Sequence, residues 1–286
     1  MPTEIADAIA TVVGKATEAI RTNEEGSRLG GDIEHVHQMR VATRRIRAYL
    51  KAARPVLDGD VVATLREDLS ALAATLGAVR DLDVMIDRMH REAAALGEPD
   101  TAALERLIGS LDAERDRDRL ALIAVLDRPE YQDMLAELDS AAADPPVVDP
   151  WADLTDLAAA EWRKLARAKH KLDVKYGEHP PDDDLHELRI YGKRARYAAE
   201  LLPKRTAVSR FLATLADLQE VLGDHQDACV LEERLRAMVA GAADPGAALA
   251  AGRVIEGCRG RRRSARAEFP PAWVRVESAG AKAFRD

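Results

Sequence analysis

A concentration of cationic side chains between His37 and Arg54 is the feature of this sequence best suited to chemistry. The stretch reads HQMRVATRRIRAYLKAAR and contains no acidic residue, although the whole chain has 50 Asp and Glu against 42 Lys and Arg. Arg offers planar, bidentate donors to phosphate oxygens, and Lys offers a compact positive charge. The stretch therefore predicts a binding site for an anion.

Helix geometry places most of these cations on one face. With about 100° between successive residues, five of them share one narrow stripe, and apolar residues such as Met39 and Ile46 fall on the opposite side. Like charges four residues apart weaken a helix, so we expect an anionic ligand to offset their repulsion. A row of cations spaced at about 5.4 Å per turn suits a linear polyanion better than a single phosphate. The first basic stripe consists of His37, Arg40, Arg44, Arg47 and Lys51.

The same pattern returns 149 residues later, in HELRIYGKRARYAAE. A solvated helix face explains one charged run well, but matched residues at matched spacing favour a duplicated structural unit. The helix expected just before this second block adds Lys164, Arg167 and Lys171, which lie within about 60° of one another. The second basic stripe consists of His186, Arg189, Lys193 and Arg196, which correspond in order to His37, Arg40, Arg44 and Arg47.

These paired blocks resemble the CHAD domain, a histidine-containing α-helical family. The segments LGAVRDLDV, from Leu76, and LGDHQDA, from Leu222, are similar to its second block, and the resemblance covers about residues 3–268. It implies two tandem helical bundles about a pseudo-twofold axis, with both histidine helices lining a shared basic cleft or pore. It also implies inorganic polyphosphate as the ligand and a location on polyphosphate granules.

The two signature histidines have three interpretations. His37 and His186 can contact the anion as protonated donors, make a structural hydrogen bond to a neighbouring helix, or bind a metal ion. The spacing of His35 and His37 resembles a metal pair, but positions two apart on a helix point about 200° from each other. These two rings are therefore not expected to share an ion.

Two aspartates recur in the repeat, Asp81 and Asp227. Each is either a catalytic carboxylate or a residue at a helix N-terminus that also pairs with an arginine. Arg45 and Arg194 lie off the main stripes and are the candidate partners. We interpret all four residues as structural ion pairs.

Composition favours an all-α fold. Hydrophobic residues make up 47% of the 286 residues, Ala and Leu dominate, and aromatic residues make up only 4%. We expect a first helical bundle at 3–143, a proline-containing linker at 144–150, a second bundle at 151–268 and a less ordered tail at 269–286. The helices are expected at about 3–21, 32–54, 60–76, 81–96, 100–126, 129–142, 153–172, 182–202, 206–222, 225–240 and 246–267.

Several function classes find no support in the sequence. A net charge of −8 argues against a general nucleic-acid binder, and few aromatic rings are present for stacking on bases. No phosphate loop, H-E-x-x-H motif or nucleophilic triad appears, so no cofactor, metal or catalytic residue is predicted. Two cysteines and the lack of a long apolar segment favour a cytoplasmic protein without a membrane partner.

A further basic cluster near the C-terminal end either extends the basic groove or is solvated. It consists of Arg259, Arg261, Arg262, Arg263 and Arg266.

The sequence thus favours a non-catalytic module that binds inorganic polyphosphate. The alternative is an enzyme of phosphate metabolism, either a metal-dependent phosphatase or a phosphohistidine-type enzyme. That alternative requires a cluster of carboxylates facing the basic groove.

Overall fold

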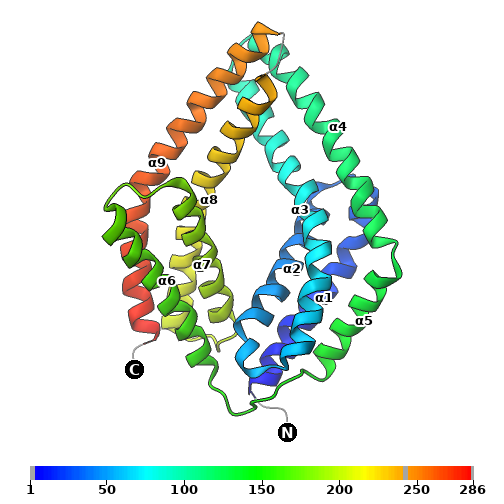
Figure 1. Cartoon of the computed structure of the whole chain (residues 1–286), viewed down its shortest axis with the longest axis vertical. Helices are drawn as coiled ribbons and strands as arrows, with labels where there is room; N and C mark the ends of the chain where they lie inside the picture. Colours follow the sequence, from blue (N-terminus) through cyan, green and yellow to red (C-terminus); the bar gives the residue numbers. More distant parts are fainter. Residues whose placement is uncertain (1–3, 241–243, 285–286) are drawn as a thin grey trace. The chain divides into compact units, whose positions relative to one another are not determined.

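A computed structural model gives the structure of residues 4–240 and 244–284, and the regular elements in this part of the chain are helices (Figure 1). The predicted all-α class is confirmed. A stretch as long and as apolar as a bilayer span requires occurs in none of the described helices. The elements are α1 (Glu4–Leu29), α2 (Ile33–Ala52), the 3-10 turn η1 (Arg54–Val56), α3 (Gly59–Ala95), α4 (Asp100–Leu126), α5 (Pro129–Ala143), α6 (Leu154–Tyr176), α7 (Asp182–Glu200), α8 (Thr206–Val239) and α9 (Pro245–Ala283).

The chain divides into two compact units, and the division falls just after the predicted linker. The first unit holds residues up to 94 together with 105–153, and the second holds 95–104 together with the residues from 154 onward. The connection between α3 and α4 therefore belongs to the second unit, whereas the sequence-based division assigned it to the first repeat. Within the second unit the buried carboxylate of Asp100 pairs with Arg253 of α9.

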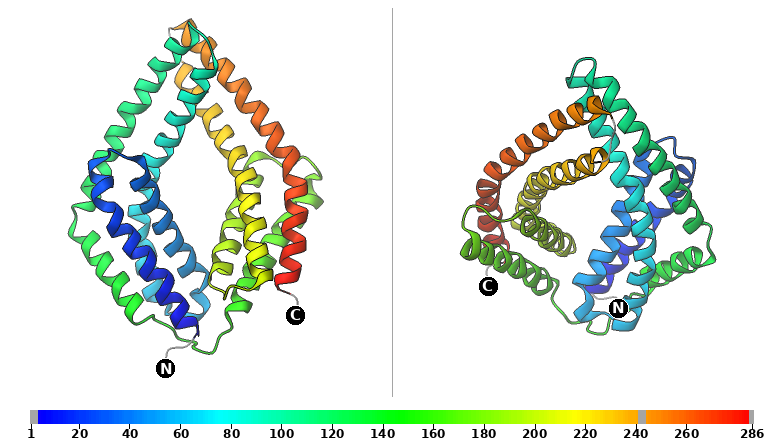
Figure 2. Two further views of the ribbon diagram at one scale, coloured as in Figure 1. Left: turned by 180° about the vertical axis from the view of Figure 1, so that it is seen from behind. Right: turned by 45° about the horizontal axis from the view of Figure 1, so that its top comes forward.

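In the first unit, α1 packs against both α2 and α5 (Figures 1 and 2). It buries Ile5, Ile9, Val13, Ala16 and Ile20, at the three- and four-residue spacing of one helix face. The helix continues to Leu29, beyond the predicted end at residue 21. Gly30 follows in a left-handed conformation with φ of 70°, and its N–H donates to the carbonyl of residue 26 at 2.8 Å.

In the second unit, α8 and α9 run side by side, and α7 packs against both α6 and α8 (Figure 2). An aromatic cluster fills the core: the ring centroids of Trp162 and Phe211 are 5.4 Å apart, and those of Trp162 and Trp273 are 6.1 Å apart. Gly280 of α9 lies against this cluster, and a Cβ placed there would come within 2.6 Å of the Trp162 ring. These aromatic residues thus belong to the core of the second unit.

Three further predicted helix ends are wrong. Gly77 lies inside α3 and Gly223 lies inside α8, so each pair of short helices expected there is one long helix. Residues 269–283 of the tail predicted to be less ordered are the last part of α9, which continues through Pro270 and Pro271, and residues 285–286 lie outside the described part of the chain. Burial of side chains explains this continuation, because Phe269, Trp273 and Val276 are all in the core of the second unit. Tertiary packing overrides the low helix propensity of Gly and Pro.

Candidate functional site

Helix α2 holds the first basic stripe on a well-anchored element. The carboxylate of Asp32 caps its N-terminus by accepting from the N–H of Glu34 at 2.8 Å. The opposite face is fixed by Met39, Ile46 and Leu50, which are buried. The stripe residues His37, Arg40, Arg44 and Arg47 are half-buried, and Lys51 is exposed. The helix therefore presents the row of cations that the sequence predicts.

Arg40 is tied to α3 through a close approach of the backbone. Its guanidinium pairs with the carboxylate of Asp81 at 3.0 Å. A Cβ placed on Gly77 would lie 2.6 Å from Nη1 of Arg40, so glycine makes room for this side chain. Burial lowers the pKa of Arg40, Asp81 opposes the change, and Arg44 and Arg80 add to it. Asp81 is therefore a mid-helix partner of a stripe residue, and the prediction that it begins a helix is wrong.

His37 lies among positive charges. Burial lowers its pKa, and Arg80 of α3 together with Arg44 and Arg40 lowers it further, while Glu34 opposes them. These effects favour the neutral form of the ring in the free protein. An anion placed beside it would favour its protonation, so proton uptake can accompany anion binding. His35 serves a different purpose, since its Nδ1 lies 3.0 Å from the side-chain oxygen of Asn23.

Helix α7 holds the second basic stripe in a similar way. Arg189 lies over Gly223 of α8, with Nη2 at 3.6 Å from the position of a Cβ on that glycine. Arg196 donates to the side-chain oxygen of Gln219 at 3.2 Å and to the carboxylate of Glu200 at 3.0 Å. The Nδ1 atom of His186 is buried without a hydrogen-bond partner in the part of the chain that the structure describes. That nitrogen therefore has unused hydrogen-bonding capacity.

The arginine anchors recur at the same sequence distance in both units. Arg47 donates to the hydroxyl of Ser70 at 3.3 Å, and this serine lies 23 residues further along the chain. Arg196 and Gln219 are also 23 residues apart. Because α3 and α8 align at an offset of 146 residues, Gln219 lies three positions beyond the counterpart of Ser70, so the two anchors are similar in kind and not identical in position. The predicted pseudo-twofold axis and the predicted shared cleft stay predictions.

The cations of α6 differ in how they are used. Lys164 pairs with Glu161, Arg167 donates to the carbonyl of residue 163 at 3.2 Å, and Lys171 is exposed. Lys169, which sequence reasoning did not single out, is buried against the rings of Phe269 and Trp273 and pairs with Asp173. Lys169 is a structural residue, and a ligand role for Lys164, Arg167 and Lys171 stays a prediction.

The arginine cluster of α9 forms ion pairs with acidic residues. Arg266 pairs with Asp182 at 2.5 Å, and Arg262 pairs with both Asp182 and Glu232. Arg259 also pairs with Glu232, at 3.2 Å, and Arg263 pairs with Glu256 at 3.0 Å. Although burial opposes it, Arg266 and Arg262 hold the pKa of Asp182 below its ordinary value. The cluster thus fastens α9 to the start of α7 and to α8.

Asp182 is also one corner of a group with the composition of a metal site. One ligand atom from each of Asp182, His225 and Cys229 lies within 4.8 Å of the others. Sequence reasoning missed this group because Asp182 is distant in the chain. However, two arginines already bind the same carboxylate, and burial raises the pKa of the Cys229 thiol to about 11. A neutral thiol and two fixed positive charges oppose a cation there.

The expected structural ion pairs are only partly located. Asp81 pairs with Arg40, and the guanidinium of Arg194 lies over the ring of Tyr191 at 5.4 Å from its centroid. Asp227 lies in the middle of α8, not at a helix start, and Arg45 lies half-buried on α2. Structural roles for Arg45 and Asp227 stay predictions.

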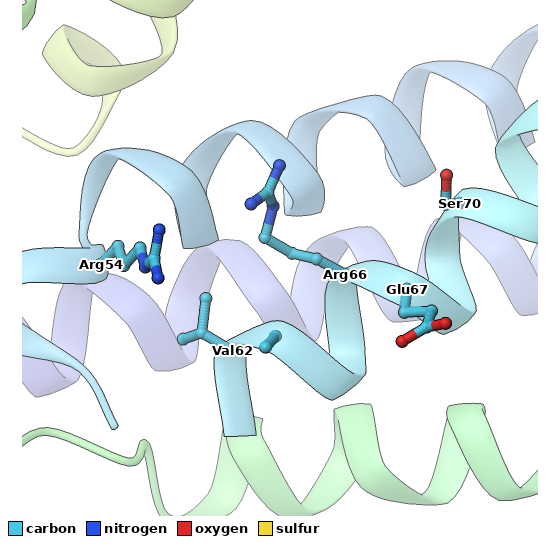
Figure 3. Close-up of a pocket in the computed structure, with 6 residues that line it drawn as sticks. Arg54, Val62, Arg66, Glu67 and Ser70 are labelled. Atoms are coloured by element: carbon cyan, nitrogen blue, oxygen red, sulfur yellow. The ribbon is translucent and has the colours of Figure 1, made fainter. Parts of the chain in front are cut away.

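A pocket of about 420 Å³ lies where the first basic stripe ends (Figure 3). Its polar side chains from α3 were not predicted, although they share one face of α3. Arg66, Ser70, Gly77 and Asp81 follow one another at spacings of four, seven and four residues, which is a helix period. This common face was not recognised because one helix was predicted to end just before Gly77. The residues of this α2–α3 pocket are Arg54, Val62, Ala63, Arg66, Glu67 and Ser70.

Comparison with known proteins agrees with this architecture. The chain is 34% identical over 207 residues to two uncharacterized proteins of Mycobacterium tuberculosis, MT2285 and Rv2226; the match covers 70% of this chain and 39% of each of theirs. The chain thus spans well under half the length of these curated relatives.

Two solved structures have the same fold. PptA from Streptomyces chartreusis matches with a TM-score of 0.74 at 21% identity, over 96% of this chain and 100% of that one. The CHAD domain from the plant Ricinus communis matches with a TM-score of 0.72 at 24% identity, over 96% and 92% of the two chains. The family model of the CHAD domain matches residues 11–236, and the chain therefore belongs to the CHAD domain family.

Proposed function

We propose that this chain binds inorganic polyphosphate through the first and second basic stripes and does not alter it chemically. The observation that carries the proposal is the repetition of cationic side chains together with their supports. In each unit one arginine lies over a glycine of the next long helix, and another donates to a polar side chain 23 residues ahead. Arginines held in this way are preorganised to bind oxygen atoms of an anion.

The type of anion follows from what accompanies the cations. A protein that grips single-stranded nucleic acid usually adds aromatic platforms. Here Tyr49 and Tyr197 are buried, and the aromatic cluster lies in the core of the second unit. A bare chain of phosphates needs no stacking surface. Membership of the CHAD family supports the same choice, because polyphosphate binding is what that family implies.

The proposed contact residues come from three helices. Those of α2 and α7 are the two stripes, and those of α6 are Lys164, Arg167 and Lys171. We expect Lys164 to contribute least to the affinity for polyphosphate, because Glu161 already neutralises its charge. A location on polyphosphate granules would follow from such binding, and it is part of the proposal.

Charge reversal tests this function directly. Replacing Arg44 and Lys193 together by Glu is expected to abolish binding of long-chain polyphosphate while the helix content in circular dichroism stays unchanged. In the unmodified protein, affinity should fall steeply with salt, because binding releases counterions from the polyanion. The exposed residue Arg210 of α8 provides a matched control, and Arg210→Glu should retain binding. An Arg44→Glu/Lys193→Glu variant with undiminished affinity would remove the proposal.

An enzymatic function has one observation in its favour, the Asp182, His225 and Cys229 group. It would need a bound divalent cation, which Arg262 and Arg266 oppose. Incubation with polyphosphate and Mg²⁺ or Mn²⁺ separates the two functions. The binding proposal predicts no released phosphate and a chain length that does not change, whereas progressive shortening of the polymer would establish the enzyme.

A further inference from the structure

The first basic stripe leads into a pocket at one end. Helix α2 ends at Ala52, the turn η1 follows at Arg54–Val56, and α3 starts back at Gly59. The α2–α3 pocket lies at this reversal of the chain, and Arg54 continues the row of cations beyond Lys51. An extended anion lying along α2 would therefore reach the pocket after its last contact with the stripe.

The walls of the pocket are suited to an anionic group. Arg66 and Ser70 reach to the same side of α3, whereas the carboxylate of Glu67 turns the other way (Figure 3). The hydroxyl of Ser70 accepts from Arg47 of the stripe at 3.3 Å, which leaves its hydrogen to donate. Val62, which is buried, and Ala63 are the apolar lining residues. The pocket thus joins two guanidinium groups and one hydroxyl to the end of the stripe.

We propose that the α2–α3 pocket binds the terminal phosphate of a linear polyphosphate chain; this inference rests on the proposed function. An internal phosphate of such a chain has two non-bridging oxygens and one charge. A terminal phosphate has three, and like a phosphate monoester it carries about −1.5 to −2 at pH 7. Two arginines and a hydroxyl match the additional oxygen and charge. A volume of about 420 Å³ accommodates this group with water and its neighbouring phosphates.

The residues that correspond to Arg54 and Arg66 in the second unit are not cationic. The basic helices align at an offset of 149 residues, which places Pro203 at the position of Arg54; α3 and α8 align at an offset of 146, as Leu76 and Leu222 do, which places Leu212 at the position of Arg66. Leu212 packs against the core cluster of the second unit. Neither can supply a cation. The pocket therefore holds one end of a chain and gives the bound polymer a defined starting point on α2.

Chemical capping of the polymer tests the inference. Short polyphosphates of one defined length are prepared with free ends, or with both ends converted to phosphoramidates of a small neutral amine, which removes an oxygen and a charge. The unmodified protein is expected to bind the free-ended chain about 10-fold more tightly than the capped chain, because the capped chain lacks one charge-assisted contact. An Arg54→Gln/Arg66→Gln variant should bind both forms equally, at the affinity of the unmodified protein for the capped form.

Further variants keep the test decisive. Glu67→Gln removes a negative charge next to the pocket and should raise affinity for the free-ended form only, whereas the control Arg210→Gln should keep the preference unchanged. Equal affinity of the unmodified protein for both forms would overturn the chain-end pocket and leave polyphosphate binding intact. A preference that survives in Arg54→Gln/Arg66→Gln would also overturn it. Failure to bind either form would instead overturn the proposed function.

Discussion

The two basic helices share one plan but differ in how their charge is balanced. Arg47 of α2 donates to a neutral hydroxyl, that of Ser70. Its counterpart Arg196 of α7 also pairs with the carboxylate of Glu200 at 3.0 Å. The residue of α2 that corresponds to Glu200 is Lys51, so one position carries opposite charges in the two helices.

A second position shows the same trend. Glu187 of α7, directly after the signature histidine, corresponds to the neutral Gln38 of α2. At these two positions α2 carries a cation or a neutral residue where α7 carries an acid, although Arg40 of the first basic stripe also pairs with Asp81. Because attraction of a polyanion depends on uncompensated charge, we expect the first stripe to contribute more of the affinity. The duplicated scaffold thus presents two surfaces of unequal strength.

The largest expected effect is a difference in lost affinity between matched charge reversals in the two stripes. Arg44→Glu should weaken binding of long-chain polyphosphate by roughly 100-fold, and Lys193→Glu by roughly 10-fold, because only the second change occurs where acids already reduce the field. Isothermal titration calorimetry at one fixed salt concentration measures both. Equal losses would show that the acids of α7 have no influence on the ligand.

Exchange of the opposed charges should reduce the difference. Lys51→Glu is expected to weaken binding about 10-fold, whereas Glu200→Lys should strengthen it several-fold by removing the carboxylate that pairs with Arg196. The slope of log affinity against log salt should become shallower in the first variant and steeper in the second. Opposite or absent changes in slope would contradict the assignment of charge to the two helices.

Protonation of His37 gives a smaller effect. Its pKa is lowered in the free protein by burial and by Arg80, Arg44 and Arg40, with Glu34 opposing. A bound polyanion raises that pKa, so binding takes up a proton and affinity should rise a few-fold as pH falls through the region below about 6.5. His37→Gln should flatten the pH dependence of affinity. An unchanged pH profile in that variant would show that His37 is not the group that takes up the proton on binding.

The same lowered pKa predicts how stability responds to pH without ligand. The unfolded chain takes up the proton on residue 37 at a higher pH than the folded protein does. The contribution of His37 to the free energy of unfolding is therefore complete above about pH 6.5 and declines as pH falls towards the folded pKa. Urea unfolding of the unmodified protein and of His37→Gln across this range measures the difference.

The smallest expected effect distinguishes the two glycines. Gly223→Ala should stabilise the protein by about 0.5–1 kcal/mol through helix propensity, since its Cβ would meet Arg189 at an ordinary 3.6 Å. Gly77→Ala should gain less, because its Cβ would displace Arg40 and disturb the pair with Asp81. Thermal unfolding compares them. A larger gain for Gly77→Ala would show that the close approach to Arg40 is unimportant.

The periodic elements of this fold were largely predictable from the sequence. The all-α class, the family and the faces of α2 and α7 followed from cations and apolar residues at helical spacing. The predicted helix ends at Gly77, at Gly223 and near Phe269 were wrong because they relied on the low helix propensity of Gly and Pro. Burial of neighbouring side chains decides these positions, and burial cannot be read directly from the sequence. Reading α3 as one helix would have revealed the common face of Arg66, Ser70 and Asp81.

Contacts between distant segments could not be predicted. The arginines of α9 looked like an extension of a basic groove or a solvated cluster, but they pair with Asp182 and Glu232. Sequence spacing gives no sign of such partners, because they lie on α7 and α8. The pairing of Asp81 with Arg40 was missed for the same reason, and Arg45 had been named as its candidate partner.

The central claim is that the two signature histidines lie where polyphosphate binds, and their imidazole signals test it most directly. The chain has seven histidines, which His→Gln variants assign one by one in NMR spectra. On addition of long-chain polyphosphate, the signals of His37 and His186 should shift while those of the exposed His90 and His179 stay in place. Shifts confined to His90 and His179, with His37 and His186 unchanged at saturation, would contradict the account.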